Sequence, residues 1–200
     1  SAFMGGASLR YQFDNGFAVF ASYAQTTSLP IIDDLPRATR NTGDLPTESQ
    51  LQARNRIFTA EEAETYEIGA SFDRVGVFSD GDVLALKVNY YDTALDDVTS
   101  YAGVAEVDTS GIEIEGSYAF EQGLYFDMNA NFTEGDEVDF SGVSSDWGNL
   151  AQDSLRLTGG YRFGEVADVS VEVVNAIDSD IVNSSDPAAG DDYTLLNLRA

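Results

Sequence analysis

Cysteine and histidine are both absent from this chain of 200 residues, and basic residues are scarce. Disulfides and thiol chemistry are therefore excluded within the chain, as are histidine general bases and zinc or haem sites built from cysteine or histidine ligands. Any enzyme made from these residues would depend on carboxylates, hydroxyls and arginine. We expect no cofactor.

The shortage of basic residues leaves a strongly acidic chain. Lys and Arg number 10 against 35 for Asp and Glu, which gives a formal net charge of −25. A field of this sign repels phosphate backbones, so we expect no nucleic acid among the partners.

Long apolar runs are also missing. No stretch of about 18 apolar residues occurs, which excludes a helical membrane span but not membrane-spanning strands, because strands never produce that signal. The chain has no signal peptide and opens inside a strand pattern, "SAFMGGASLRYQF", so we expect it to be cut from a longer protein.

Alternation of apolar and polar residues is the strongest positive feature of the sequence. It extends over Ser110 to Phe132, "SGIEIEGSYAFEQGLYFDMNANF", and breaks only at Glu121-Gln122-Gly123. Successive side chains of a strand point to opposite faces, so this stretch predicts an antiparallel hairpin with one apolar face. That face meets either the core of a soluble sandwich or lipid, and alternation alone does not decide between them.

The rest of the chain repeats this hairpin pattern. Four strands end on an aromatic residue, at Phe13, Phe72, Phe120 and Phe163, and each is followed by a short connection and a return strand. The return strands lead into long polar segments, Thr26 to Thr59, Thr93 to Val107, Glu134 to Asp153 and Asp178 to Asp191. A ninth strand, "DYTLLNLRA", closes the chain. The prediction is about nine meandering strands with short connections at one end and long ones at the other.

This asymmetry favours an outer-membrane β-barrel, in which short periplasmic turns oppose long extracellular loops. Aromatic residues gather at the short-connection end, where we expect an interfacial belt: Phe13, Phe17, Phe72, Phe120, Tyr125, Phe126 and Phe163. Gly69, Gly116 and Gly159 lie at strand positions that favour close approach or bends. We predict that Ile114, Phe126 and Leu157 face lipid.

Several segments, taken in order, resemble the barrel of TonB-dependent outer-membrane receptors. "FTAEEAETYEIGASF" is similar to the family's loop and Tyr-Glu-x-Gly strand, "LALKVNYYDTALDDVTS" to the strand and loop that follow, "VDTSGIEIEGSYAF" to a Gly-(Ile/Val)-Glu strand, and "DYTLLNLRA" to a strand near the C-terminal end. The resemblance implies a 22-stranded barrel around an N-terminal plug. It would place residues 1–200 within one barrel domain, at about strands 12 to 20, with the plug and the last strands outside the chain.

Two departures from the family pattern concern the ligand and the alignment. Haem receptors of the family carry a Phe-Arg-Ala-Pro segment and a haem-ligating histidine, whereas this chain reads Gln25-Thr26-Thr27-Ser28-Leu29-Pro30 and has no histidine. Haem is therefore disfavoured. Ala60 stands where the family often has proline before the residue that corresponds to Glu61.

Polar residues on the strands are predicted to face the barrel lumen. They are Glu67, Glu113, Glu115, Asp127, Asn129, Arg156 and Arg162. The carboxylates among them could form a catalytic pair, but solvated polar side chains are expected on a lumen face, so we predict no enzyme. The acidic segments "EGDEVDFSGVSSD" and "DPAAGDD" carry oxygen ligands for Ca²⁺ without the spacing of an EF-hand, and we expect solvated loops.

The long segment Ser28 to Thr59 contains four of the ten basic residues, Arg37, Arg40, Arg54 and Arg56. Guanidinium groups suit the oxygens of carboxylate, catecholate or phosphate, so these residues are candidates for binding an anionic ferric chelate. The alternative is that they pair with acidic residues of the loops, where exposed pairs contribute little.

The resulting interpretation is a receptor in the outer membrane of a Gram-negative bacterium that imports a scarce nutrient, a ferric siderophore. Its expected partners are outer-membrane lipid, the TonB energy-coupling protein acting through the plug, and the small-molecule ligand. The alternatives are a passive porin or structural barrel, and a soluble secreted β-sandwich that binds sugar or calcium.

Overall fold

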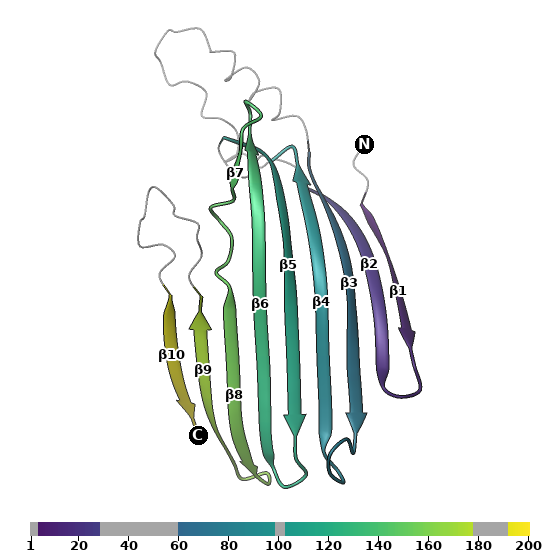
Figure 1. Ribbon diagram of the computed structural model, residues 1–200, viewed down its shortest axis with the longest axis vertical. Helices are drawn as coiled ribbons and strands as arrows, with labels where there is room; N and C mark the ends of the chain where they lie inside the picture. Colours follow the sequence, from purple (N-terminus) through teal and green to yellow (C-terminus); the bar gives the residue numbers. More distant parts are fainter. Residues whose placement is uncertain (1–3, 29–59, 99–102, 178–191) are drawn as a thin grey trace.

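The computed structural model describes residues 4–28, 60–98, 103–177 and 192–200, which form a single antiparallel sheet (Figure 1). The ten strands are β1 (Gly5–Gln12), β2 (Phe17–Ser28), β3 (Glu61–Val75), β4 (Val83–Asp96), β5 (Val104–Ala119), β6 (Leu124–Asp139), β7 (Ser144–Asp146), β8 (Ser154–Phe163), β9 (Ala167–Ala176) and β10 (Tyr193–Arg199). In this part of the chain, no helix has the length and apolar character needed to cross a membrane.

The strands pair in the order in which they occur in the sequence. The path is β1-β2-β3-β4-β5-β6-β8-β9-β10, and the short strand β7 lies off this path, paired with the end of β6. The sheet is not closed, so β1 and β10 each have one unpaired edge among the described residues. The all-β antiparallel meander is confirmed, and its one unpredicted strand is β7.

Two of the short connections are built alike around a glycine. In the β1–β2 connection, Gly16 has a φ of 90°, and in the β5–β6 connection Gly123 has a φ of 103°. The carbonyl of Gly16 accepts a hydrogen bond of 3.0 Å from the N–H of Asp73, and that of Gly123 accepts one of 2.9 Å from Arg162. A Cβ at either glycine would run into a backbone carbonyl of that neighbouring strand. Positive φ and close approach together require glycine here.

The strands extend further toward the long connections than predicted. β4 continues to Asp96, β5 begins at Val104 and β6 continues to Asp139, so the predicted connections Thr93 to Val107 and Glu134 to Asp153 were too long. Backbone pairing does not depend on side-chain polarity, and beyond the apolar band the sheet no longer has one apolar and one polar face: Asp92 and Asp108 continue the apolar face, whereas Leu95 and Val107 lie on the opposite face. The sequence pattern therefore disappears before the strand ends.

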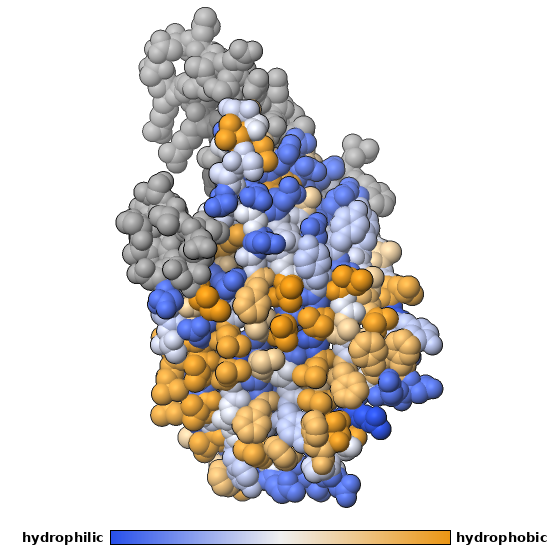
Figure 2. Space-filling model, viewed as in Figure 1, coloured by the Kyte–Doolittle hydropathy of each residue, from blue (hydrophilic) through white to orange (hydrophobic). Residues whose placement is uncertain are grey.

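Cross-strand register divides the side chains into two faces. The apolar face carries Leu9, Tyr11, Phe17, Val19, Tyr66, Ile68, Leu84, Leu86, Val88, Tyr90, Ile112, Ile114, Phe126, Met128, Phe132, Leu157, Tyr161, Val169, Val171, Leu196 and Leu198. Figure 2 shows a broad hydrophobic band on this side, which gives way to hydrophilic residues toward the long connections. The alternate residues form the polar face.

The apolar band has the height of a membrane crossing. On β6 it extends from Leu124 to Phe132, which at about 3.3 Å per residue is roughly 26 Å along the strand. Beyond Tyr90 and Phe132 the same face becomes acidic, with Asp92 and Glu134 at the next outward positions. An exposed apolar surface of this extent requires an apolar environment rather than water.

Aromatic residues border the band at both levels, as the girdles of membrane barrels do. Tyr118 and Phe120 pack edge to face at the short-connection end, and Tyr161 lies beside Phe163 there. Tyr23 and Tyr66 pack together at the other border, with the Tyr23 hydroxyl donating to Glu64.

The assignment of Tyr125 to the aromatic belt was wrong. Its neighbours Leu124 and Phe126 take the apolar face, so the alternation places Tyr125 on the polar face, where it is 9% exposed. All seven residues of the predicted belt were chosen because they lie beside a short connection. For Tyr125 this criterion indicated the wrong face of the sheet.

One buried apolar cluster lies at the long-connection end. It consists of Val98, Val104, Val107 and Trp147, with Leu95 and Leu150 packed against it. The N–H of Trp147 bonds to the carbonyl of Gly135 at 2.9 Å, which attaches the segment after β7 to β6. This small core stabilises the ends of β4, β5 and β6 where they extend beyond the apolar band.

Candidate functional site

The polar face of the sheet contains all seven residues predicted to face a lumen. Glu67 lies on β3, Glu113 and Glu115 on β5, Asp127 and Asn129 on β6, and Arg156 and Arg162 on β8. Cross-strand pairs such as Glu115 with Asn129, and Asn129 with Arg156, place them on one side. Whether this side lines a barrel lumen stays a prediction.

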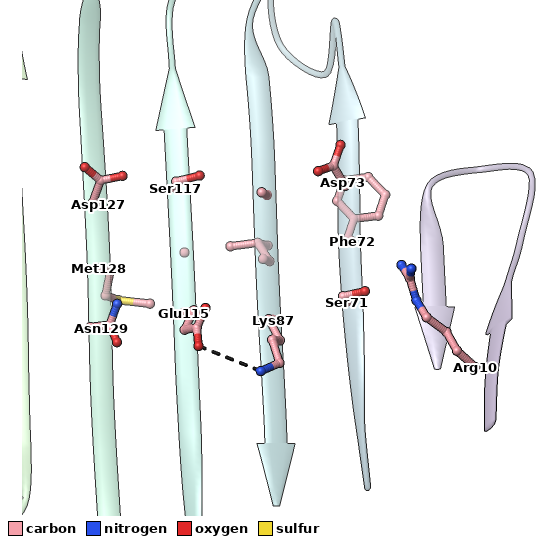
Figure 3. Close-up of a pocket in the computed structure, with 13 residues that line it drawn as sticks. Arg10, Ser71, Phe72, Asp73, Lys87, Glu115, Ser117, Asp127, Met128 and Asn129 are labelled. Carbon is pink, nitrogen blue, oxygen red and sulfur yellow. Dashed lines mark ion pairs between the residues drawn. The ribbon is translucent and has the colours of Figure 1, made fainter. Parts of the chain in front are cut away.

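A trough of about 430 Å³ runs across the polar face from β1 to β6 (Figure 3). Its polar lining consists of Arg10, Ser71, Asp73, Lys87, Glu115, Ser117, Asp127 and Asn129. The Lys87 ammonium lies 3.8 Å from the Glu115 carboxylate and 5.8 Å from the centre of the Phe20 ring. Both charged side chains are exposed, so this pair contributes little to stability and can exchange partners with a bound molecule.

A second group of polar contacts lies along the same face, closer to the long connections. The Asn89 side-chain N–H donates to Glu113 at 3.0 Å, and the Ser22 hydroxyl donates to Glu67 at 3.1 Å. Asn89 is only 3% exposed, and its side-chain oxygen has no partner among the described residues. These carboxylates accept hydrogen bonds from neighbouring strands, an arrangement that holds them in place.

Basic residues gather at the other side of the polar face, around Glu172 of β9. Glu172 is 7% exposed, with Arg199 at 3.4 Å, Arg156 at 3.7 Å and the Asn197 side-chain N–H at 3.0 Å. The buried carboxylate is thus stabilised by charged and neutral donors, and both guanidinium groups remain largely exposed. The two sides of the polar face therefore differ in charge.

Tyr125, Arg162 and Asp168 form a cluster near the short connections. The Tyr125 hydroxyl donates to Asp168 at 2.8 Å, and the Arg162 guanidinium donates to the other oxygen of Asp168 at 3.3 Å. The same guanidinium lies over the Tyr125 ring at 4.5 Å, a cation–π distance. This cluster links β6, β8 and β9.

Three aromatic side chains on the polar face cover glycines directly opposite them on the neighbouring strand. Phe20 covers Gly69, Tyr91 covers Gly111 and Tyr125 covers Gly160. A Cβ on any of these glycines would collide with the ring that covers it. The close approach predicted at Gly69 is present, whereas Gly116 and Gly159 lie on the apolar face.

Among the charged residues that the structure describes, Asp82 is the most buried, and it lies in the connection between β3 and β4. Its carboxylate accepts hydrogen bonds from the N–H groups of Val77, Phe78 and Ser79 at 2.7 to 2.9 Å, and from the Tyr118 hydroxyl at 2.5 Å. Burial raises the pKa of Asp82, but the Tyr118 and backbone hydrogen bonds lower it by more, so this pKa lies well below its usual range.

The acidic segment "EGDEVDFSGVSSD" is the end of β6, a turn and β7. With Asp92 and Asp108 it lines a cleft of about 260 Å³ at the long-connection end. Within the described ranges, no group of three or more acidic side chains has the arrangement of a metal site.

The arginines predicted to bind ligand, Arg37, Arg40, Arg54 and Arg56, lie outside the described residues, and so does most of "DPAAGDD". Sequence reasoning missed Arg10, Lys87, Asn89, Asp168 and Glu172 on the polar face. Their positions alternate with apolar residues along each strand, and this signal would have identified them.

Comparison with known proteins gives one family. A model described as "TonB dependent receptor-like, beta-barrel" matches residues 1–200. Among curated proteins, none matches the chain.

Proposed function

Because the chain belongs to the family of TonB-dependent receptor β-barrels, whose members are outer-membrane receptors and transporters, we propose that it forms part of the barrel of a receptor that imports a ferric siderophore. The observation that carries this proposal is that one face of the sheet is apolar over the length of a membrane-crossing strand, whereas the other face is polar. A barrel wall needs one face for lipid and the other for a polar interior.

The polar face is proposed to be the wall of the lumen. Its trough presents a lysine–glutamate pair and other exposed polar groups, and its other side presents the guanidinium groups of Arg156 and Arg199. Exposed charged groups of both signs suit a surface along which a hydrated plug and a polar ligand move. No covalent chemistry is needed for this role.

The short connections are proposed to face the periplasm and the long ones the cell exterior. The connection from β2 to β3 would then present Arg37, Arg40, Arg54 and Arg56 to the medium. These arginines would bind the anionic oxygens of a ferric chelate before it enters the barrel. The ligand would pass through the barrel after a plug rearranges, driven by the TonB energy-coupling protein. The complete barrel would have 22 strands, and residues 1–200 would form about strands 12 to 20.

Uptake of radioactive iron by whole cells tests this function. Cells that carry the intact receptor are supplied with ferric siderophores of catecholate, hydroxamate and carboxylate type, with and without an active TonB protein. Saturable uptake of one type that requires TonB supports the proposal. Uptake that persists without TonB and rises linearly with concentration would instead identify a passive porin.

A further inference from the structure

A groove of about 490 Å³ crosses the apolar face at the short-connection end. Leu84, Leu86, Phe126, Met128, Leu157 and Val171 form its walls, and two glycines, Gly116 and Gly159, lie between them. The groove extends over β4, β5, β6, β8 and β9. Its volume falls in the range of small-molecule sites.

The groove exists because these two positions lack side chains. Gly116 lies directly between Leu86 and Met128, and Gly159 lies directly between Phe126 and Val171. A Cβ added at Gly159 would have nearest contacts of 3.5 Å with the Phe126 ring, an ordinary distance, whereas one at Gly116 would meet the end of the Leu86 side chain at 3.2 Å; neither glycine has a left-handed φ. The backbone therefore does not require glycine here, and the groove itself is what the two glycines provide.

An apolar groove in a bilayer is not selective by itself. Hydrocarbon chains fill it without a hydrophobic driving force, because the surrounding lipid is equally apolar, so only packing favours one occupant. A particular lipid is retained only if a polar group of the protein also binds its head group.

Arg74 is placed to supply that group. It lies on the apolar face at the end of β3, directly opposite Leu84 of the groove wall. Its guanidinium makes no hydrogen bond or ion pair with any residue that the structure describes. Every other basic residue in the described ranges lies on the polar face, namely Arg10, Lys87, Arg156, Arg162 and Arg199.

We propose that this groove holds one acyl chain of a glycerophospholipid whose phosphate binds Arg74. The positive group at the end of the groove complements an anionic phosphate, in a chain whose net charge of −25 otherwise repels it. The lipid would belong to the leaflet at the short-connection end, which is the periplasmic leaflet under the proposed topology. The inference does not depend on the identity of the imported ligand.

Native mass spectrometry of the intact receptor in mild detergent, titrated with dioleoyl-phosphatidylglycerol, measures this binding. Gly159→Leu fills the groove and Arg74→Gln removes the charge. We expect each change to weaken binding of the first lipid by about tenfold or more. Gly159→Ala is a milder second variant, and it should give a smaller loss in the same direction. Gel mobility with and without heating shows that each variant is folded.

Two variants are matched controls. Ala21→Leu places the same leucine side chain at an exposed position of the apolar face away from the groove, and Arg10→Gln removes a charge from the polar face. Both should retain lipid as the unaltered receptor does. Unchanged binding in Gly159→Leu or Arg74→Gln, or equal losses in the controls, would overturn the proposal. A preference for lipid A over the phospholipid at this site would overturn the choice of occupant.

Discussion

The Tyr118 hydroxyl donates a hydrogen bond of 2.5 Å to the carboxylate of Asp82. Asp82 belongs to the connection between β3 and β4, whereas Tyr118 lies on β5, so the bond attaches a turn to a strand that it does not connect. The same carboxylate accepts from three backbone N–H groups of its own turn. One side chain thus defines the turn and fixes its position against the sheet.

Asp82→Asn is expected to lower the free energy of unfolding at pH 7, because the asparagine N–H₂ would oppose donors that now bind an anion. Folding lowers the pKa of Asp82. Its carboxylate therefore makes its full contribution to the free energy of unfolding above the unfolded-state pKa of about 3.9, and this contribution is lost as pH falls from there toward the folded-state pKa. Urea titrations in lipid at pH 7 and pH 3 should show the difference between aspartate and asparagine shrinking at pH 3.

Asp80→Asn is the control, since Asp80 is an exposed carboxylate in the same connection. It should leave the unfolding curve unchanged at both pH values. If the deficit of Asp82→Asn is the same at pH 7 and pH 3, the ionised carboxylate is not the source of stability.

Arginine substitutions distinguish the two faces of the sheet. Arginine at Ile114 or Leu157, near the middle of the apolar band, is expected to destabilise the intact barrel by about 2 to 4 kcal/mol, and arginine at Phe126, close to the short-connection border, by less. Glu115→Arg and Asn129→Arg, on the polar face of the same strands, should cost much less. Unfolding titrations in lipid measure both sets, and similar losses for both would mean that the apolar face does not meet hydrocarbon.

The faces were predictable because alternation is a local property. In the stretch from Ile112 to Phe132, each side chain's face follows from its position within a strand, and the register agrees. The ends of β4 and β6 were not predictable, because the apolar face ends at Tyr90 and Phe132 and is continued by the acidic residues Asp92 and Glu134. β7 is a strand because it pairs with Asp136 to Val138 of β6, and no local pattern in the sequence indicates that pairing.

Gly160→Ala tests the ring that covers this glycine. The new methyl group would collide with the Tyr125 ring, and moving the ring would break its hydrogen bond to Asp168 and its contact with Arg162. We expect a loss of about 1 to 3 kcal/mol in unfolding free energy. Gly159→Ala is the matched control on the other face, where an added Cβ meets Phe126 at an ordinary distance.

A double-mutant cycle separates collision from other effects. In a Tyr125→Ala background the methyl group at position 160 has no ring to displace, so the added cost of Gly160→Ala should nearly vanish. Additive losses from the two substitutions would show that the ring is not what excludes a side chain there.

The polar clusters illustrate what sequence alone does not supply. Arg156 was predicted to lie on the polar face, but its proximity to Glu172 and the approach of Arg199 to the same carboxylate depend on the register of three strands. A face is predictable from one strand, whereas a contact needs two.

The unpaired edges of β1 and β10 predict that residues 1–200 do not behave as an independent soluble protein. Edges with free N–H and C=O groups are not tolerated in hydrocarbon, and in water they pair with other chains. On β10, Leu196 and Leu198 are 66% and 75% exposed. Light scattering after chromatography should show aggregation or dependence on detergent; a monodisperse, cooperatively folding monomer without detergent would contradict the barrel interpretation.

The proposed ligand contacts in the β2–β3 connection are tested by changing Arg37, Arg40, Arg54 and Arg56 to alanine together. Each charged hydrogen bond lost should weaken binding of the transported ferric siderophore by about 1.5 to 3 kcal/mol. The loss should be smaller at high salt, because exposed charges are screened. Binding titrations on intact cells measure the affinity, and surface expression should be unchanged because loops contribute little to barrel stability.

The position of this connection is checked independently by labelling. The chain has no cysteine, so Ser49→Cys introduces a unique thiol within it. A membrane-impermeant maleimide should label that thiol on intact cells, since the short connections at the opposite ends of the strands would face the periplasm. Labelling only after the outer membrane is permeabilised would reverse the topology. Unchanged affinity in the quadruple variant, with labelling from outside, would instead mean that these arginines pair with acidic residues of the loops and do not bind the ligand.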